Sequence, residues 1–422
     1  MTIVLNGSLR RVFGALTVIT LAACKTDKIL EVEFPGQIPT EQINDPALAA
    51  VLVRSVIGDF ECAYSNYMSG SSVHSDEYET SNSNVPLANW GERTITPDEN
   101  DYAIGTCEGN FGMNLTLHTA RFQSEETSKK LASWTDQQVT GRASLQAQAK
   151  IYGAYSYLLM GEGFCQVAFD GAAVQPPTAA LTLAETKFGE GIAFAQASSN
   201  TDMLNLARVG MARTKMDLKK WAEAAQFASQ VDTLYNKNVD RGQESNRRWN
   251  KLWRLAEQQG AYTVAVAYRS MKAVRLAGDT VADPRVLVKD AGRGAFNSEV
   301  RLWVTTKYTG LVSPMRLASG IEANLIRAEA LIQQNQVVQG MLLINNRRAK
   351  VGLAPLVAVT QADAINAIID ERRKELSFEG GHRLNDLLRY KITWKVGSNP
   401  FTNRNYGTTT CWPHPTRETL GV

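Results

Sequence analysis

Residues 369–390 have the sequence IDERRKELSFEGGHRLNDLLRY, a dense pattern of charge interrupted by two glycines. Apolar residues recur at helical spacing on both sides of the glycine pair, as Ile368, Ile369, Leu376, Phe378, Leu384, Leu387 and Leu388. Glycine adopts the left-handed backbone that ends a helix, and Arg372, Arg373 and Lys374 lie in the last turns, where cations complement the helix dipole. The stretch therefore predicts a helix, a turn at Gly380–Gly381 and a second helix. Its charges are more consistent with salt bridges between packed helices than with catalysis.

The amino-terminal segment has the features of an export signal. Arg10 and Arg11 precede an apolar run, 12–23, that is too short to span a bilayer and has the form of a signal-peptide core. The run ends in the sequence LAAC, which is similar to a bacterial lipobox whose cysteine, here Cys24, carries diacylglycerol. We therefore predict a lipoprotein signal peptide at 1–23 and a mature chain anchored by two or three acyl chains. The alternative is a buried core helix that ends in a free cysteine.

The charge balance argues against a nucleic-acid partner. The chain has 45 Lys and Arg against 42 Asp and Glu, a formal charge of +3, and loss of residues 1–23 would remove only Arg10 and Arg11 and leave +1. A nearly neutral chain has no electrostatic footprint for nucleic acid.

The cysteines and histidines favour disulfides over a metal site. An even number of cysteines in an exported chain suggests disulfides with three possible connectivities, and the four besides Cys24 are Cys62, Cys107, Cys165 and Cys411. None of them forms a CxxC pair, and the four histidines are far apart in the sequence, so no metal or other cofactor is expected.

The organisation of the chain indicates one large helical unit. No long Pro/Gly/Ser linker divides the roughly 400 residues that follow the signal, although such a length could hold two or three domains. We predict a single domain over 24–422, with loop insertions near 69–110 and 236–312. Helical periodicity is clear at 46–64 and 142–160, with Asn44 or Asp45 as the N-cap of the first helix.

Two later stretches suggest a helical repeat. In 204–231, small Ala212 is followed by bulky Trp221 and then Ala224, and in 322–347 Ala328 is followed by Val337 and Gly340. Small residues at such positions let two antiparallel helices approach closely, as in a tetratricopeptide pair. A generic helical hairpin would explain the pattern equally well.

Several carboxy-terminal motifs together resemble the SusD/RagB family of nutrient-uptake lipoproteins. They are the 369–390 stretch, SPMRLASGIEANLIRAEA at 313–330, INNRRAKVGL at 344–353 and PHPTRE at 413–418. With the lipobox at the other end, they stand in the order expected for that family. The resemblance implies an all-α frame of tetratricopeptide-like pairs with long loop insertions. It also implies a lipid-anchored protein at the outer membrane, on the cell surface, that captures an oligosaccharide or peptide for a TonB-dependent transporter.

The sequence lacks four common enzyme motifs. It has no G-x-S-x-G elbow, no HExxH, no phosphate loop and no dinucleotide-binding turn. We therefore predict a binding protein and not an enzyme. The alternatives are a helical glycoside hydrolase or lyase, which would use two of the many carboxylates, and a tetratricopeptide-like scaffold for protein partners.

A sugar-binding site requires aromatic faces with planar polar groups beside them. The loop after the first long helix, which often contributes to the ligand face in the family that this chain resembles, supplies Tyr78 and Trp90 with Asp76, Asn89 and Arg93. Trp249, four residues from Trp253, is a second candidate, although this spacing is equally typical of core packing. Trp221, at the helix-pair position, is expected in the core.

Overall fold

The computed structural model describes residues 43–109 and 111–416. The predicted signal peptide, the predicted lipidation site Cys24 and the last two residues of the PHPTRE motif, Arg417 and Glu418, lie outside the described residues. The chain divides into two units, Met1–Leu48 and Ala49–Val422. In the first unit the described part is a short 3₁₀ helix, η2 (Pro46–Leu48), where Asp45 Oδ1 accepts a hydrogen bond from the Ala47 amide at 2.9 Å.

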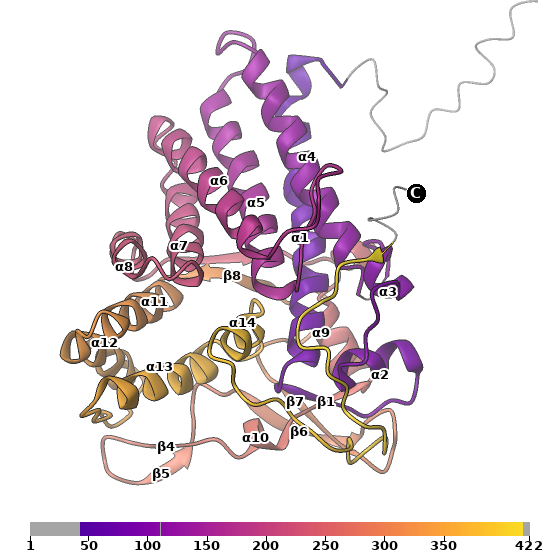
Figure 1. The fold of residues 1–422 in the computed structure, drawn as a ribbon, viewed down its shortest axis with the longest axis vertical. Coiled ribbons are helices and arrows are strands. Elements are labelled where there is room, and N and C mark those ends of the chain that lie inside the picture. The colour runs from indigo at the N-terminus through magenta and orange to yellow at the C-terminus, as the bar shows by residue number, and fades with distance from the viewer. Residues whose placement is uncertain (1–42, 110, 417–422) are drawn as a thin grey trace, which may run out of the picture. The chain divides into compact units, whose positions relative to one another are not determined.

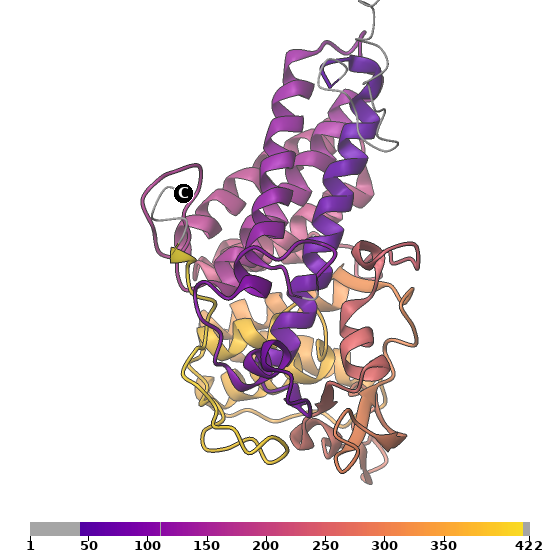
Figure 2. The same cartoon turned by 90° about the vertical axis from the view of Figure 1, so that its right-hand side faces the viewer.

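The second unit is built mainly from antiparallel helices, and the predicted all-α, tetratricopeptide-like class is confirmed. Its long amino-terminal helices lie side by side (Figures 1 and 2). They are α1 (Ala49–His74), α4 (Asn114–Ser133), α5 (Arg142–Gly163), α6 (Thr178–Ala197), α7 (Thr201–Asp217) and α8 (Trp221–Ser229). The carboxy-terminal helices are α11 (Gly320–Gln333), α12 (Val337–Lys350), α13 (Gln361–Glu375) and α14 (His382–Arg389).

Both predicted helical pairs are present, as α7 with α8 and α11 with α12. Ala212, Ala224 and Ala328 are fully buried at the contacts. A Cβ atom at Gly340 would lie 2.8 Å from the carbonyl oxygen of Ala328, so only glycine permits this approach of α12 to α11. The small residues therefore act as the sequence pattern predicted.

The predicted helix, turn and helix at 369–390 is also confirmed. Helix α13 begins in a capping box, in which Thr360 and Asp363 each bond the other's backbone amide. It ends at Glu375, and the chain turns through Gly380 and Gly381, which have φ values of 53° and 73°. A Cβ atom at Gly381 would lie 2.4 Å from the Tyr67 ring, so glycine meets both a conformational and a packing requirement here.

In the described ranges the strands form four two-stranded antiparallel ladders. The pairs are β1 (Tyr78–Thr80) with β3 (Tyr262–Val264), β2 (Asn236–Val239) with β8 (Met315–Ser319), β4 (Lys272–Val274) with β5 (Thr280–Ala282), and β6 (Val288–Gly294) with β7 (Arg301–Thr305). Short helical segments connect them, namely α2 (Val85–Glu92), α3 (Asn100–Ala103), η3 (Asn246–Arg248), α9 (Lys251–Trp253), η4 (Arg254–Gln258) and α10 (Val266–Arg269). None of the helices in the described ranges is long and apolar enough to cross a membrane.

Two disulfides tie distant parts of this unit together. Cys62 of α1 is bonded to Cys107, 45 residues away, and Cys165 is bonded to Cys411, 246 residues away. Of the three connectivities that the sequence allows, this one closes a shorter loop with the first bond and ties the end of α5 to the carboxy-terminal segment with the second.

The charges of the 369–390 stretch form buried salt bridges, as the sequence predicted. Arg372 of α13 pairs with Asp386 of α14, with 3.0 Å between Nε and Oδ2. Glu371 pairs with Arg348 of α12, with 2.6 Å between Oε1 and Nη1. The charge pattern therefore fixes how α12, α13 and α14 pack against one another.

Candidate ligand-binding site

The structure places the predicted aromatic anchors inside the protein. Trp90 is 0% exposed and stacks on Phe111 with 4.5 Å between ring centroids, and its other ring contacts are Tyr102 and Trp412. Tyr78 is 1% exposed and contacts the Phe378 ring at 5.4 Å. Neither ring has a face available for stacking on a sugar.

Protein contacts also occupy the polar residues predicted beside them. Asp76 accepts hydrogen bonds from Arg383 at 2.6 and 2.7 Å. Burial opposes ionisation of Asp76, but the hydrogen bonds and charge of Arg383 outweigh it, so the pKa of Asp76 is lowered. Asn89 bonds Glu99 and Thr94, and the Arg93 guanidinium lies 5.1 Å from the centroid of the Trp394 ring. These side chains hold the loop in place and do not converge on a cavity with Trp90.

Trp249 lies apart from the Trp90 cluster. Its indole Nε1 donates a hydrogen bond to the Gln243 carbonyl at 3.3 Å, and the Arg254 guanidinium lies 4.7 Å from its ring centroid. One face of this partly buried ring is therefore already covered by a cation.

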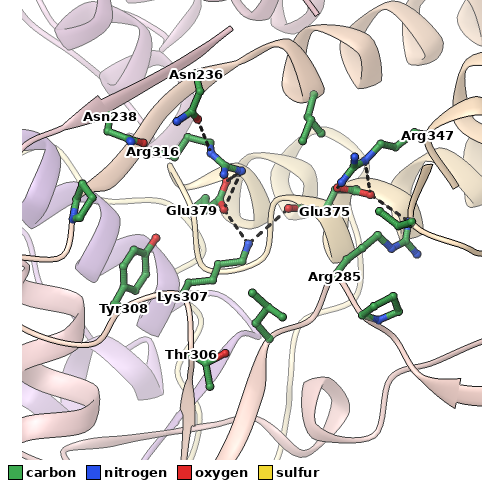
Figure 3. A pocket seen from close by; sticks show the side chains of 15 residues that line it. Asn236, Asn238, Arg285, Thr306, Lys307, Tyr308, Arg316, Arg347, Glu375 and Glu379 are labelled. Atoms are coloured by element: carbon green, nitrogen blue, oxygen red, sulfur yellow. Dashed lines mark hydrogen bonds and ion pairs between the residues drawn. The ribbon is translucent and has the colours of Figure 1, made fainter. Parts of the chain in front are cut away.

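A groove lined by planar polar side chains lies elsewhere, between the β2–β8 ladder, the α11–α12 pair and the α13–α14 turn (Figure 3). It consists of two cavities, of about 510 and 600 Å³, that share Asn236, Arg316, Ile321 and Arg347. We call it the Arg316 groove. Its other lining residues are Thr233, Leu234, Tyr235, Asn238, Pro284, Arg285, Leu287, Thr306, Lys307, Tyr308, Pro314, Ser319, Gly320, Asn324, Leu343, Asn346, Ala349, Lys350, Val351, Glu375 and Glu379.

Arg316 lies where the two cavities meet, held between two strands and a turn. Its Nε donates to Asn236 Oδ1 at 3.0 Å, and its Nη1 lies 3.3 Å from Glu379 Oε1. Lys307 binds the same carboxylate at 2.8 Å and also donates to the Ser377 carbonyl at 2.7 Å. Figure 3 shows these side chains on one wall of the cavity. The Arg316 side chain is still 34% exposed.

Local backbone geometry positions this wall. The register between β2 and β8 shifts between Lys237 and Asn238, so the strand is irregular where Asn236 and Asn238 line the groove. Phe378 has φ 61°, and its amide donates to Glu77 Oε1 at 2.6 Å, which fixes the turn that carries Glu379. Burial raises the pKa of Glu77 to about 7.

The second wall carries a bidentate ion pair. Arg347 of α12 donates two hydrogen bonds of 2.9 Å to Glu375 of α13. Beneath it, Arg285 bonds Asp283 and Glu371. Burial would lower the pKa of Arg285, but its bonds to these two carboxylates outweigh burial and raise it. The groove therefore presents cations whose orientation is fixed by buried carboxylates.

Such an arrangement is suited to binding a polar, neutral ligand. Amides and guanidinium groups read hydroxyls in well-defined directions, and the paired carboxylates cancel much of the local positive charge. Among residues 43–109 and 111–416, no cluster of three or more His, Cys, Asp or Glu is arranged to hold a metal ion.

Sequence reasoning missed the groove because its residues come from separate parts of the chain. Asn236 and Arg316 lie on paired strands, while Arg347 and Glu379 belong to two different carboxy-terminal motifs. Their charge could have identified Arg347 and Glu379 as candidate ligand-binding residues, but only the fold shows that they face one cavity.

Comparisons with known proteins agree with this architecture. A profile of the SusD family matches residues 305–418, which contain β8, α11–α14 and residues of both groove walls. The fold is similar to a SusD superfamily protein from Bacteroides vulgatus, with TM-score 0.67, 12% identity, and 89% of this chain and 97% of that one covered. It is also similar to a SusD-like carbohydrate binding protein from the same organism, with TM-score 0.63, 13% identity and coverage of 84% and 86%.

A third similar structure is a laminarin binding SusD-like protein, with TM-score 0.55, 16% identity and coverage of 89% and 97%. No curated protein sequence matches this chain. The helical pairs, the carboxy-terminal turn and the matched region define a SusD-like architecture. The SusD family model matches the same carboxy-terminal region whose motifs resemble that family, and the fold is that of the SusD-like structures.

Proposed function

We propose that this protein is a cell-envelope lipoprotein that captures an oligosaccharide in the Arg316 groove and delivers it to a TonB-dependent outer-membrane transporter. The observation that carries the binding role is the groove itself, two adjoining cavities lined by planar polar groups in fixed orientations. Two of the similar structures are described as carbohydrate binding and laminarin binding, which supports a glycan as the ligand. Cys24 would anchor the protein at the outer membrane, on the cell surface.

The proposed role is binding without turnover. In the groove, Glu375 is paired with Arg347, and Glu379 is paired with Arg316 and Lys307. Lys307 also donates a hydrogen bond to the Ser377 carbonyl. A glycosidase needs one carboxyl group that stays protonated and a second that acts as base or nucleophile. The salt-bridged carboxylates here are better suited to orienting Arg316 and Arg347 than to proton transfer.

Arg316→Ala should weaken polysaccharide binding by about 1.5 to 3 kcal/mol, tenfold or more, because it removes a charged hydrogen-bond donor at the centre of the groove. Glu379 keeps Lys307 as a partner, so the fold should be preserved. Affinity electrophoresis of the full-length protein in laminarin, amylopectin and xylan gels measures the change.

The matched control is Arg275→Ala, which removes an arginine that also forms an exposed ion pair, with Asp279, but lies outside the groove. Equal retardation of the two variants would remove the groove from the proposal. New reducing ends released from any of the three polysaccharides would show an enzyme instead of a capture protein.

Cys24→Ala should release the protein from the membrane fraction, because each buried methylene of the acyl chains contributes about 0.8 kcal/mol to anchoring. Fractionation of cells followed by a carbonate wash measures the distribution. A variant that stays with the membrane through the wash would contradict the lipid anchor.

A further inference from the structure

A second cavity, separate from the Arg316 groove, lies where the end of α5, the α7–α8 turn and α14 meet. Its volume is about 600 Å³, within the range of small-molecule sites. Trp221 and Tyr390 contribute aromatic rings, and Glu162, Asp217, Asn385 and Arg389 contribute polar groups. We call it the Trp221 cavity. Trp221 was expected in the core, but it is only partly buried and lines this space.

The polar lining of the Trp221 cavity is a rigid, buried network. Asn385 Nδ2 donates to Glu162 Oε1 at 3.2 Å and to Asp217 Oδ1 at 3.0 Å. Arg213 binds both oxygens of Glu162, and Arg389 binds Glu329 and Asp386. The side chains of Glu162 and Asp217 are 0% and 4% exposed. Groups held in this way keep their directions without a ligand.

Two atoms of the network, on residues that line the cavity, lack a hydrogen-bond partner. Within the part of the chain that the structure describes, Asp217 Oδ2 and Arg389 Nε are buried and have no hydrogen-bond partner. They are close neighbours, since Arg389 Nε lies 3.4 Å from the other Asp217 oxygen. A buried polar atom without a partner is costly, so a ligand that bonds both atoms would gain free energy on binding.

A hydroxyl group fits this pair of atoms better than a charged group does. It can accept a hydrogen bond from Arg389 Nε while donating one to Asp217 Oδ2. An ammonium group has no acceptor for the arginine, and a phosphate or carboxylate would place a further negative charge beside Glu162.

A hydroxyl fits the site in either protonation state of Asp217. Burial and then the charge of Glu162 raise the pKa of Asp217 well above its ordinary value, although Arg389 opposes the shift. If Asp217 is protonated, its Oδ2 offers a proton to the hydroxyl oxygen instead of accepting one. A hydroxyl therefore matches either form of the site.

The Trp221 indole supplies the apolar surface that a sugar also needs. Trp221 is the first residue of α8 and lines the cavity. Tyr390 follows the last residue of α14, and its hydroxyl donates a hydrogen bond to Glu329 at 2.6 Å. On the basis of the proposed glycan-capture function, we propose that the Trp221 cavity binds a single neutral pyranose residue. The ring stacks on Trp221, and one hydroxyl bridges Asp217 and Arg389.

Saturation-transfer difference NMR tests the site with the full-length protein and the methyl pyranosides of glucose, galactose, mannose and xylose as probes. At least one probe should show saturation transfer, and Trp221→Ala should reduce it about tenfold, as expected for loss of a central aromatic anchor. Trp221→Tyr, which keeps a stacking face, should retain most of the signal. Absence of transfer from all four probes to the wild-type protein would overturn the proposal.

A second variant keeps the test decisive if Trp221→Ala does not fold. Thr178 is exposed at the edge of the cavity, so Thr178→Trp should fill the entrance without disturbing the core and abolish the signal. Trp249→Ala, which removes a partly buried tryptophan outside both sites, should leave it unchanged. Unchanged saturation transfer in Thr178→Trp would overturn the assignment.

Failure of this proposal and failure of the proposed function give different results. Signal lost in Arg316→Ala but kept in Trp221→Ala and Thr178→Trp would leave the groove as the glycan site and refute the Trp221 cavity. Signal lost in the two cavity variants, with no effect of Arg316→Ala on polysaccharide retardation, would support the Trp221 cavity and refute the Arg316 groove.

Discussion

Trp90→Ala should lower the free energy of unfolding by about 3 to 5 kcal/mol, because it removes a large, completely buried ring and leaves a cavity. The indole stacks on Phe111 and packs against Tyr102 and Trp412. Its surroundings cannot easily collapse, since the aromatic neighbours are themselves buried. Urea denaturation followed by circular dichroism measures the loss.

The same variant distinguishes a structural from a ligand-binding role for Trp90. Retardation of the folded fraction in polysaccharide gels should match that of the wild type, because Trp90 has no exposed surface. Trp249→Ala serves as the comparison, and the partly buried ring should cost less stability. Unaltered stability of Trp90→Ala together with weaker polysaccharide binding would return this loop to the ligand face.

The burial of Trp90 shows where sequence reasoning about the site reached its limit. The residues around it, Asn84, Asn89, Glu92 and Arg93, are polar, and a polar stretch with one tryptophan is typical of an exposed loop. In the structure this stretch forms α2, whose buried face includes Ala88 and Trp90. The sequence could not show this, because the aromatic partner Trp412 comes from the far end of the chain.

The carboxy-terminal helices were predictable because their determinants are local. Gly380 and Gly381 break the helix through backbone conformation, and Gly340 permits close packing one helical pair earlier. The charge pattern predicted salt bridges but not which residues form them. Arg348 and Asp386 became partners of Glu371 and Arg372 only when α12, α13 and α14 packed together.

Both cavities depend on contacts between segments that are distant in the sequence. Asn236 and Arg316 come together only through the β2–β8 ladder. In the Trp221 cavity, Asn385 of α14 bridges Glu162 of α5 and Asp217 of α7. None of these polar residues has a local sequence pattern that distinguishes it from an ordinary surface residue. The helical pairs do have such a pattern, in their regularly spaced small residues.

Arg372→Met should lower the free energy of unfolding by about 3 to 5 kcal/mol, the cost of removing one partner from a buried ion-pair network. Arg372 is 1% exposed, and its Nε lies 3.0 Å from both oxygens of Asp386 and 3.5 Å from Glu329 Oε2. Burial alone would lower its pKa, but the charges of Asp386 and Glu329 raise it, so the guanidinium stays ionised. After the substitution, Arg389 is the remaining cation bonded to both buried carboxylates.

The loss should depend on pH in a way that identifies its cause. Burial opposes ionisation of Asp386, but Arg372 and Arg389 outweigh it and hold the pKa of Asp386 below 3.8. A carboxyl group with a lowered folded-state pKa stabilises the protein above its unfolded pKa, and this contribution is lost as the pH falls through the folded value. The difference in free energy of unfolding between the wild type and Arg372→Met should therefore be largest near neutral pH and should shrink as the pH falls below 3.8. Urea denaturation across this range measures it, with Arg275→Met, which breaks an exposed pair, as a control that should cost little stability. A loss for Arg372→Met as small as that of the control, or one that does not change with pH, would show that packing and not the buried charge pair holds α13 against α14.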